Sequence, residues 1–202
     1  LVRALAQPQH VKKVVEMALS DGVVKTYRAV QDRVSVELPT GYSGAGRVLA
    51  VGEGVDAFKV GDRVACAGSQ YAFHAEVVSV PRNLVVPMPD NIGFDAASTV
   101  ALGAISLQGV RRAAPTLGET FVVIGLGVLG QLTAQILRAN GCRVIGVDLD
   151  RGRIAAALRN GMNWGVHPDD TSDIDQVNRL TGGTGADGVI ITAAAAENAI
   201  IS

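Results

Sequence analysis

The chain has 202 residues, of which 48% are hydrophobic and 18% charged, and its formal net charge is −1. This composition supports a sizeable packed core and excludes a wholly disordered chain. The near-zero charge argues against an electrostatic grip on nucleic acid or an anionic membrane, so a small-molecule partner is expected. No apolar run reaches the roughly 18 residues that a membrane-spanning helix needs.

Cysteine is sparse, with only Cys66 and Cys142 in the chain. Neither a disulfide framework nor a CxxC redox pair is indicated, so a reducing cytoplasm is the expected location. The chain begins at Leu1 and stops at Ser202, just after a strand-like run. We therefore expect it to be part of a longer protein.

Residues from about 8 to 35 are predicted to be helical. Apolar residues recur there at three- and four-residue spacing, with charged residues on the other side. Ser20-Asp21-Gly22 interrupts this pattern, and a second helix is expected through Val24–Val30. Residues 1–38 are accordingly assigned to a helical insertion that forms a packed, solvated surface element.

Residues 39–115 are richer in glycine and in short β-branched runs. The runs at Arg47–Val51, Asp62–Cys66 and Phe73–Val80 predict an antiparallel barrel or sandwich. A helix is expected over 94–113, with Arg111 and Arg112 in its last turn, where cations suit the helix dipole. We assign this segment to a small β domain with a connecting helix.

From residue 116 to 202, strand and helix patterns alternate. Strands are expected at 120–124, 142–148, 164–166 and 187–192, and helices at 128–140, 151–160 and 172–181. Such alternation is typical of a parallel sheet covered by helices, so the fold class of this segment is α/β.

A glycine-rich turn joins the first of these strands to the first helix. The apolar run 121–124 leads directly into Gly125-Leu126-Gly127-Val128-Leu129-Gly130. The first glycine permits a tight turn, the second lets backbone N–H groups approach a pyrophosphate, and the third lets the helix pack on the strand. Because the helix N-terminus also offers unpaired N–H donors, the turn predicts a Rossmann-type dinucleotide site.

An acid follows the second strand at the spacing that this motif requires. Asp148 lies 23 residues after Gly125, close to the roughly 20 expected for a carboxylate that binds the adenosine ribose. A carboxylate there repels a 2′-phosphate, which favours NAD over NADP, although Arg151 and Arg153 could soften the preference. The alternative is that Asp148 caps the next helix, a role that suits Asp150 better. A second cluster, Gly182-Gly183-Thr184-Gly185, precedes a strand and is predicted to be a turn.

Together these motifs resemble the medium-chain dehydrogenase/reductase superfamily, which includes zinc alcohol dehydrogenases and zinc-free quinone reductases. The resemblance covers residues 40 to 192 and runs through the segments 44–48, 51–55, 59–64, 74–81, 125–130 and 181–189. It implies a partial GroES-like catalytic domain over 39–115, without its first strands, and a partial Rossmann domain over 116–202. It also implies that Gln108 and Thr192 lie near the cofactor. The segment 8–35 resembles the insertion of bacterial bi-domain oxidoreductases, in which a second dehydrogenase-like domain follows.

The chain departs from the zinc-dependent members at their metal ligands. Where these members carry Gly-His-Glu, it has Gly41-Tyr42-Ser43, and a cysteine ligand aligns with Ala104. Because a catalytic zinc needs about three protein ligands, and two of the three positions are lost, we expect no zinc.

Without a Lewis acid, carbonyl or alkene reduction still needs a proton donor or an oxyanion stabiliser. Tyr42, which replaces the metal ligand, is the first candidate, and the alternative is a packed tyrosine with a satisfied hydroxyl. Ser43 is an accessory candidate. His74 is expected to pack in the core or on a strand face, and Cys66 has no base nearby in sequence.

The predicted function is zinc-independent hydride transfer between NAD(H) and a carbonyl, alcohol or activated alkene. Two alternatives stay open: an NADPH-dependent quinone or enone reductase, and a non-enzymatic nucleotide-binding module of a larger protein. No nucleic-acid or membrane partner is expected, whereas a homodimer and a fused second oxidoreductase domain downstream stay open.

Overall fold

The computed structural model describes residues 15–20, 22–27, 40–170 and 173–193. The chain forms two compact units, Leu1–Thr40 and Gly41–Ser202. In the first unit, residues 15–20 and 23–27 are helical, and Gly22 between them has a φ of +87°. The predicted helix break is therefore confirmed, while the rest of the predicted 8–35 helix lies outside the described residues.

The second unit begins with a three-stranded antiparallel sheet of order β1-β2-β3. Its strands are Ser43–Arg47, Arg63–Ala67 and Val85–Pro87, and a single 3-10 turn, Arg82–Leu84, precedes β3. Gly44 lies opposite Cys66 in the β1–β2 register. A small core of Ala65, Met88 and Ala97 joins this sheet to the short helix α4, Phe94–Ala97.

Two of the predicted strands of this sheet are corrected by the structure. The strand expected at Arg47–Val51 lies earlier, at Ser43–Arg47, because pairing with β2 outweighs the weak strand preference of its glycines. Phe73–Val80 forms bends and irregular backbone instead of a strand. A strand needs a neighbour to satisfy its N–H and C=O groups, and β2 pairs with β1 and β3, not with this run.

The predicted helix over 94–113 is divided into α4 and α5, Val100–Ala113, by Ser98 and Thr99. Helix α5 contacts β1 and β2 at one end and α6 and β7 elsewhere. Its last turn contains Arg111 and Arg112, as predicted, and it ends at Ala114 in the left-handed conformation. This helix is thus the element that joins the antiparallel sheet to the parallel one.

A four-stranded parallel sheet of order β6-β5-β4-β7 forms the rest of the second unit. Its strands are β4 Thr120–Ile124, β5 Arg143–Val147, β6 Trp164–Val166 and β7 Gly188–Ile191. The helices are α6 Val128–Ala139, α7 Arg151–Arg159 and α8 Asp173–Leu180. The predicted elements of this part are confirmed to within a residue or two at each end.

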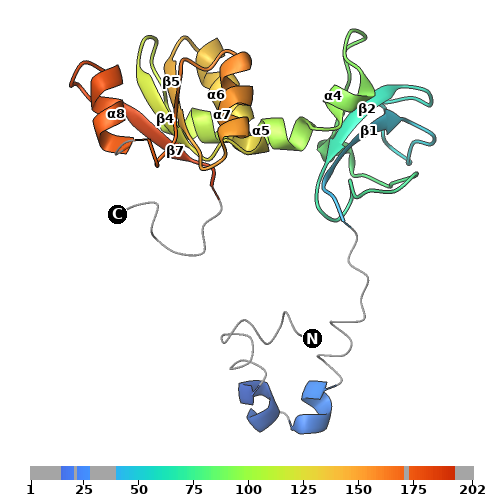
Figure 1. Cartoon of the computed structure of the whole chain (residues 1–202). Coiled ribbons are helices and arrows are strands. Elements are labelled where there is room, and N and C mark those ends of the chain that lie inside the picture. The colour runs from blue at the N-terminus through green and yellow to red at the C-terminus, as the bar shows by residue number, and fades with distance from the viewer. Residues whose placement is uncertain (1–14, 21, 28–39, 171–172, 194–202) are drawn as a thin grey trace. The chain divides into compact units, whose positions relative to one another are not determined.

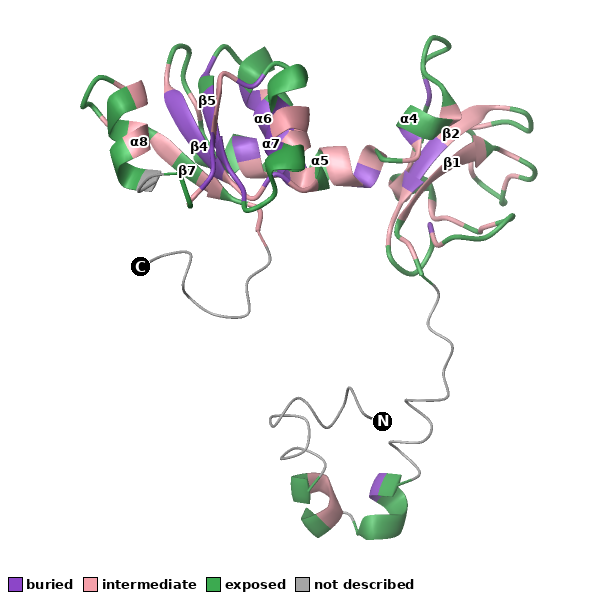
Figure 2. Ribbon diagram, in the orientation of Figure 1, coloured by how far each residue is buried: buried purple, intermediate pink, exposed green. Residues whose placement is uncertain are grey.

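Both faces of the parallel sheet are covered. One face packs against α5, α6 and α7 around a core that includes Val123, Leu137 and Val144, and the other packs against α8 (Figure 1). Figure 2 shows the buried residues concentrated in β4, β5 and the facing sides of the helices. Burial of β4 and β5 on both faces explains the continuous apolar runs of these two strands. None of the described helices is long and apolar enough to cross a membrane.

Candidate nucleotide-binding site

The site begins where β4 ends, at Gly125. This residue has a φ of +90°, and a Cβ on it would lie 2.7 Å from the backbone nitrogen of Ala193. Both facts exclude a side chain, because L residues rarely adopt this conformation and the neighbouring backbone has no room to move. The first glycine is therefore required by the turn itself, as predicted.

The third glycine is required by helix packing. A Cβ on Gly130, in the first turn of α6, would collide with the carbonyl oxygen of Gly125 and lie 2.8 Å from Thr192 Oγ1. Since the obstructing atom is backbone, a side chain here would push α6 away from the turn. This agrees with the predicted role of the third glycine in close packing of helix on strand.

The second glycine, Gly127, has no such requirement within the protein. Its backbone angles, φ −65° and ψ −168°, suit any residue, and a Cβ on it would meet no atom within 4 Å. Gly127 is also the N-cap of α6, and no side chain caps that helix. The turn therefore leaves open space directly above the uncapped end of a helix, which is where an anion is stabilised.

Asp148 follows β5 and is held against the glycine turn. Its Oδ2 accepts a hydrogen bond from Leu126 N at 2.6 Å, and its Oδ1 accepts one from Asp150 N at 2.7 Å. The residue is only 8% exposed, and its Oδ2 lies 3.7 Å from Arg153. Each carboxylate oxygen retains a further lone pair that can accept a hydroxyl.

The helix cap that was the alternative role for Asp148 belongs to Asp150. The Asp150 Oδ1 accepts hydrogen bonds from Gly152 N at 2.7 Å and Arg153 N at 3.3 Å, at the start of α7. The two acids therefore have separate tasks, one on the helix and one on the turn.

The side chains of Thr192 and Gln131 both donate hydrogen bonds to the glycine turn. The Thr192 hydroxyl donates to the Gly125 carbonyl at 2.5 Å. The Gln131 amide donates to the Leu126 carbonyl at 3.2 Å and to the Arg153 carbonyl at 2.9 Å, which joins the turn to α7. Sequence reasoning missed Gln131, although its place directly after Gly130 in the first turn of α6 could have singled it out.

Arg151, the first residue of α7, is paired with an acid that sequence reasoning also missed. Its guanidinium donates two hydrogen bonds to Asp170, at 2.9 and 2.6 Å. This hydrogen bonding lowers the pKa of the Asp170 carboxyl. Asp170 comes shortly after β6, and the carboxyl ends of parallel strands share one edge, so its position offered a signal.

The glycine turn, Asp148 and Thr192 are brought together at the carboxyl ends of β4, β5 and β7. Gln108 lies exposed in the middle of α5, and no interaction joins it to the turn in the described part of the chain. Leu126 is fully buried, while Val128 is 61% exposed at the start of α6. The glycine turn, Asp148 and Thr192 thus form one hydrogen-bonded cluster.

Tyr42 and Ser43 lie in the antiparallel part of the unit. Tyr42 is 41% exposed, so its phenol is accessible. The Ser43 hydroxyl donates to the Ser98 carbonyl at 2.6 Å and accepts from Ala101 N at 3.1 Å, at the start of α5. Thr99, the N-cap of α5, contributes no side-chain cap, so Ser43 supplies one from β1.

His74 is not on a strand face, which corrects the sequence prediction. It is exposed, and its imidazole packs so closely on Gly41 that a Cβ there would collide with it. Burial raises the pKa of the Cys66 thiol, which agrees with the weak case for a nucleophile.

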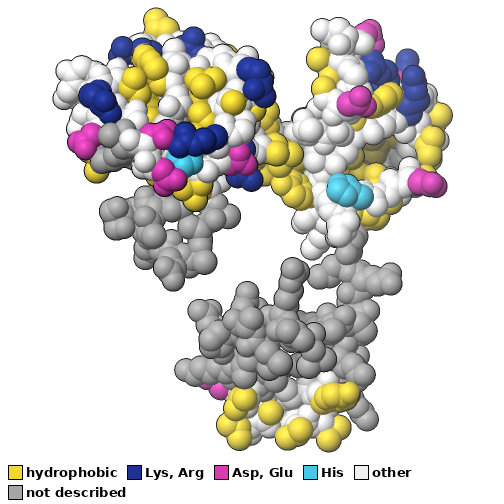
Figure 3. Space-filling model, viewed as in Figure 1, with side chains coloured by type: hydrophobic (Ala, Val, Ile, Leu, Met, Phe, Trp, Pro, Cys, Tyr) yellow, Lys and Arg dark blue, Asp and Glu magenta, His cyan; other side chains and the backbone are white. Residues whose placement is uncertain are grey.

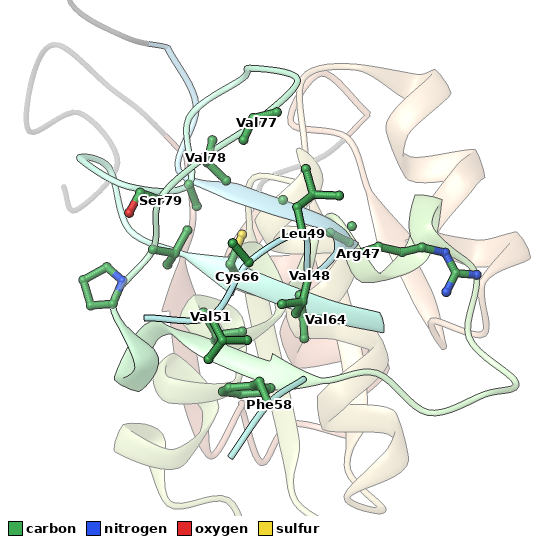
Figure 4. A pocket seen from close by; sticks show the side chains of 18 of the residues that line it. Arg47, Val48, Leu49, Val51, Phe58, Val64, Cys66, Val77, Val78 and Ser79 are labelled. Atoms are coloured by element: carbon green, nitrogen blue, oxygen red, sulfur yellow. The ribbon is translucent and has the colours of Figure 1, made fainter. Parts of the chain in front are cut away.

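A hollow of about 790 Å³ lies beside the antiparallel sheet (Figure 4). Valine side chains of 48, 51, 64 and 78 point into it together with Phe58 and Cys66, whereas the Arg47 side chain extends away. Neither Tyr42 nor Ser43 lines it. Its wall is largely apolar, and it is separate from the glycine turn.

The residues aligned with zinc ligands do not fit a zinc ion. Tyr42 and Ala104 offer neither a thiolate nor an imidazole, which together with carboxylates are the usual zinc ligands. Within the described ranges, no cluster of three or more His, Cys, Asp or Glu residues could hold a metal.

A glycine turn between the carboxyl end of a parallel strand and a helix, with an acid directly after the next strand, defines a Rossmann-type α/β fold, here joined to a small antiparallel domain. Residues 12–90 match the alcohol dehydrogenase GroES-like domain, and residues 128–200 match the zinc-binding dehydrogenase family. The chain belongs to the medium-chain dehydrogenase/reductase superfamily.

Individual relatives agree with this membership. A quinone oxidoreductase of Rattus norvegicus is 32% identical over 72% of this chain and 45% of its own length. An NAD-dependent alcohol dehydrogenase of Sulfurisphaera tokodaii is 29% identical over 87% of this chain and 59% of its own. The crystal structure of Escherichia coli quinone oxidoreductase complexed with NADPH has 25% identity and a TM-score of 0.62 over 71% of this chain and 45% of that one. The chain spans about half the length of the relatives it matches.

Proposed function

We propose that the glycine turn binds the pyrophosphate of a nicotinamide dinucleotide. The observation that carries this proposal is Gly127 at the N-cap of α6, where no protein atom fills the space that a side chain would take and no side chain caps the helix, so a ligand has room there. The uncapped N–H groups at the start of α6 supply hydrogen-bond donors and partial positive charge toward that ligand. The bound dinucleotide would supply the hydride chemistry, and the chain would bind and orient it.

The preferred dinucleotide in this proposal is NAD(H). Among the relatives, one is named as NAD-dependent and another is described with NADPH, so the preference depends on the residues of this chain. The buried carboxylate of Asp148 keeps lone pairs for the two ribose hydroxyls. A 2′-phosphate placed against the same carboxylate would meet like charge in a poorly solvated position, which disfavours NADP(H).

The proposed activity is hydride transfer to or from a carbonyl, alcohol or activated alkene without zinc. The residues at the ligand positions do not fit a zinc ion, so the reacting oxygen needs a protein donor instead. Tyr42 is the proposed proton donor, because its phenol is accessible. The single proton of Ser43 is already donated to the Ser98 carbonyl, which leaves Ser43 an accessory at most.

The test is to titrate the full-length protein with NADH and with NADPH by fluorescence, and then to measure turnover on a panel of carbonyls, alcohols and quinones. The expected result is saturable binding with tighter NADH, turnover with at least one substrate, and no stoichiometric zinc by metal analysis. Tighter NADPH binding would favour a reductase of the quinone type, and binding without turnover would favour a nucleotide-binding module. Absence of binding to either nucleotide would refute the proposal.

A further inference from the structure

The carboxyl ends of β5 and β6 carry a group of charges beyond the acid that the proposed function uses. Basic, acidic and histidine side chains gather on the part of the molecule that contains the parallel sheet (Figure 3). The residues concerned are Arg151 and Arg153 at the start of α7, and His167, Asp169 and Asp170 after β6. Within this group, Arg153 lies beside Asp148, the proposed ribose ligand, and His167 contacts Leu149 next to it.

Each guanidinium at the start of α7 is matched by an acid. Arg153 lies 3.7 Å from the Oδ2 atoms of both Asp148 and Asp150. Arg151 makes a bidentate pair with Asp170, and the two side chains are 61% and 49% exposed. Arg151 is thus engaged by a carboxylate while open to solvent, three residues beyond the proposed ribose ligand.

Hydrogen bonds around His167 fix the position of Asp170. The buried ring of His167 accepts a hydrogen bond from Asp169 N at its Nδ1, so its Nε2 carries the proton and donates it to the Leu149 carbonyl at 3.0 Å. Asp170 N in turn donates to the His167 carbonyl at 3.0 Å. These bonds tie the end of β6 to the end of β5 and hold the Asp170 carboxylate opposite α7.

We propose that Asp170 determines nucleotide specificity by holding the Arg151 guanidinium in a bidentate pair, which keeps that cation from a 2′-phosphate. The inference rests on the proposed function, since it takes Asp148 as the ribose ligand. A planar guanidinium binds carboxylate and phosphate with the same fork of N–H donors, so the two acceptors compete for one cation. In this arrangement selectivity against NADPH comes from repulsion by Asp148 and from sequestration of Arg151.

The experiment measures dissociation constants of NADH and NADPH for the full-length protein in four forms: wild type, Asp170→Asn, Arg151→Gln and the double variant. Asp170→Asn is expected to tighten NADPH about two- to fivefold, the range that a solvent-exposed ion pair can contribute, and to leave NADH within twofold. The double variant is expected to lose this gain. The gain should also shrink as salt is added, because the new contact is an exposed charge pair.

Asp169→Asn is the matched control. It removes the same charge from the neighbouring residue, which is exposed and lies 3.7 Å from His167 but makes no bidentate bond to Arg151. An unchanged NADPH-to-NADH ratio in Asp170→Asn, an equal gain in Asp169→Asn, or a gain that survives in the double variant would overturn the inference alone. A wild-type protein that binds neither nucleotide, or prefers NADPH, would overturn the proposed function and this inference with it.

Discussion

Alanine substitutions at two glycines of the same turn separate ligand binding from folding. In Gly127→Ala the new methyl group meets no protein atom within 4 Å, and the backbone angles suit alanine. Only the small N-cap advantage of glycine over alanine is lost, so we expect the free energy of unfolding to fall by less than about 1 kcal/mol. The methyl group does, however, occupy the space assigned to the pyrophosphate.

The expected effect of Gly127→Ala is therefore on affinity. Displacing the diphosphate from one or two backbone donors forfeits charge-assisted hydrogen bonds of about 1.5–3 kcal/mol each, so NADH should bind at least about tenfold more weakly. Gly130→Ala should instead lower the free energy of unfolding by about 1–3 kcal/mol, the usual cost of overpacking, because its methyl group collides with the Gly125 carbonyl.

Urea unfolding of both variants, combined with NADH fluorescence titration, gives the two quantities independently. Wild-type NADH affinity in Gly127→Ala would refute the assignment of the pyrophosphate to this turn. A loss of stability in Gly127→Ala as large as that in Gly130→Ala would show that the space above Gly127 is not open.

The remaining predictions concern four side chains. Both carboxylate oxygens of Asp148 accept a backbone N–H, from Leu126 and from Asp150, whereas Asp148→Asn leaves only one acceptor oxygen, so urea unfolding should show a loss of about 1–3 kcal/mol together with weaker NADH binding; unchanged stability would contradict this pair of hydrogen bonds. Ser43→Ala should lower stability by about 1 kcal/mol, because α5 loses its cap, and should leave the NADH dissociation constant unchanged; full stability with lost turnover would instead place Ser43 in the chemistry. Tyr42→Phe should reduce kcat by about 100-fold or more while NADH binding is retained, with Tyr71→Phe as the control, and wild-type kcat would remove Tyr42 as proton donor. Burial covers the Cys66 thiol and raises its pKa, so iodoacetamide at pH 8 should modify it more slowly than a cysteine peptide, and peptide-like rates would show an accessible thiolate.

The parallel sheet could be predicted closely because its signals are local. Each strand is a short apolar run, each helix has its own periodicity, and Gly125 and Asp150 mark boundaries that depend on neighbouring residues only. The antiparallel part was predicted less well, because a strand there exists only where a partner strand lies alongside. Phe73–Val80 has the alternation of a strand without pairing to β2, whereas Ser43–Arg47, rich in glycine, is paired.

Of the candidate site, sequence spacing predicted the glycine turn and its acid, and the structure brings them within hydrogen-bond distance. Sequence could not show that Ser43 caps α5, since that bond joins residues 58 positions apart. Nor could it show that Arg151 is paired with Asp170, because the pair depends on how β6 lies beside β5. Contacts between distant segments are set by packing and not by local pattern.

The carboxylate of Asp148 has consequences for any attempt to redesign the choice of coenzyme. The hydrogen bond that it accepts from Leu126 N fixes the glycine turn before a nucleotide binds. Replacing this acid to admit a 2′-phosphate would therefore also loosen the turn that is proposed to bind the diphosphate. Asp170 contacts the exposed guanidinium of Arg151 instead, and a substitution of Asp170 leaves the loop at Leu126 intact. A change of coenzyme preference, by engineering or by evolution, should therefore begin with substitution of the exposed Asp170. Substitution of the buried Asp148 should follow only after stabilising changes elsewhere have accumulated.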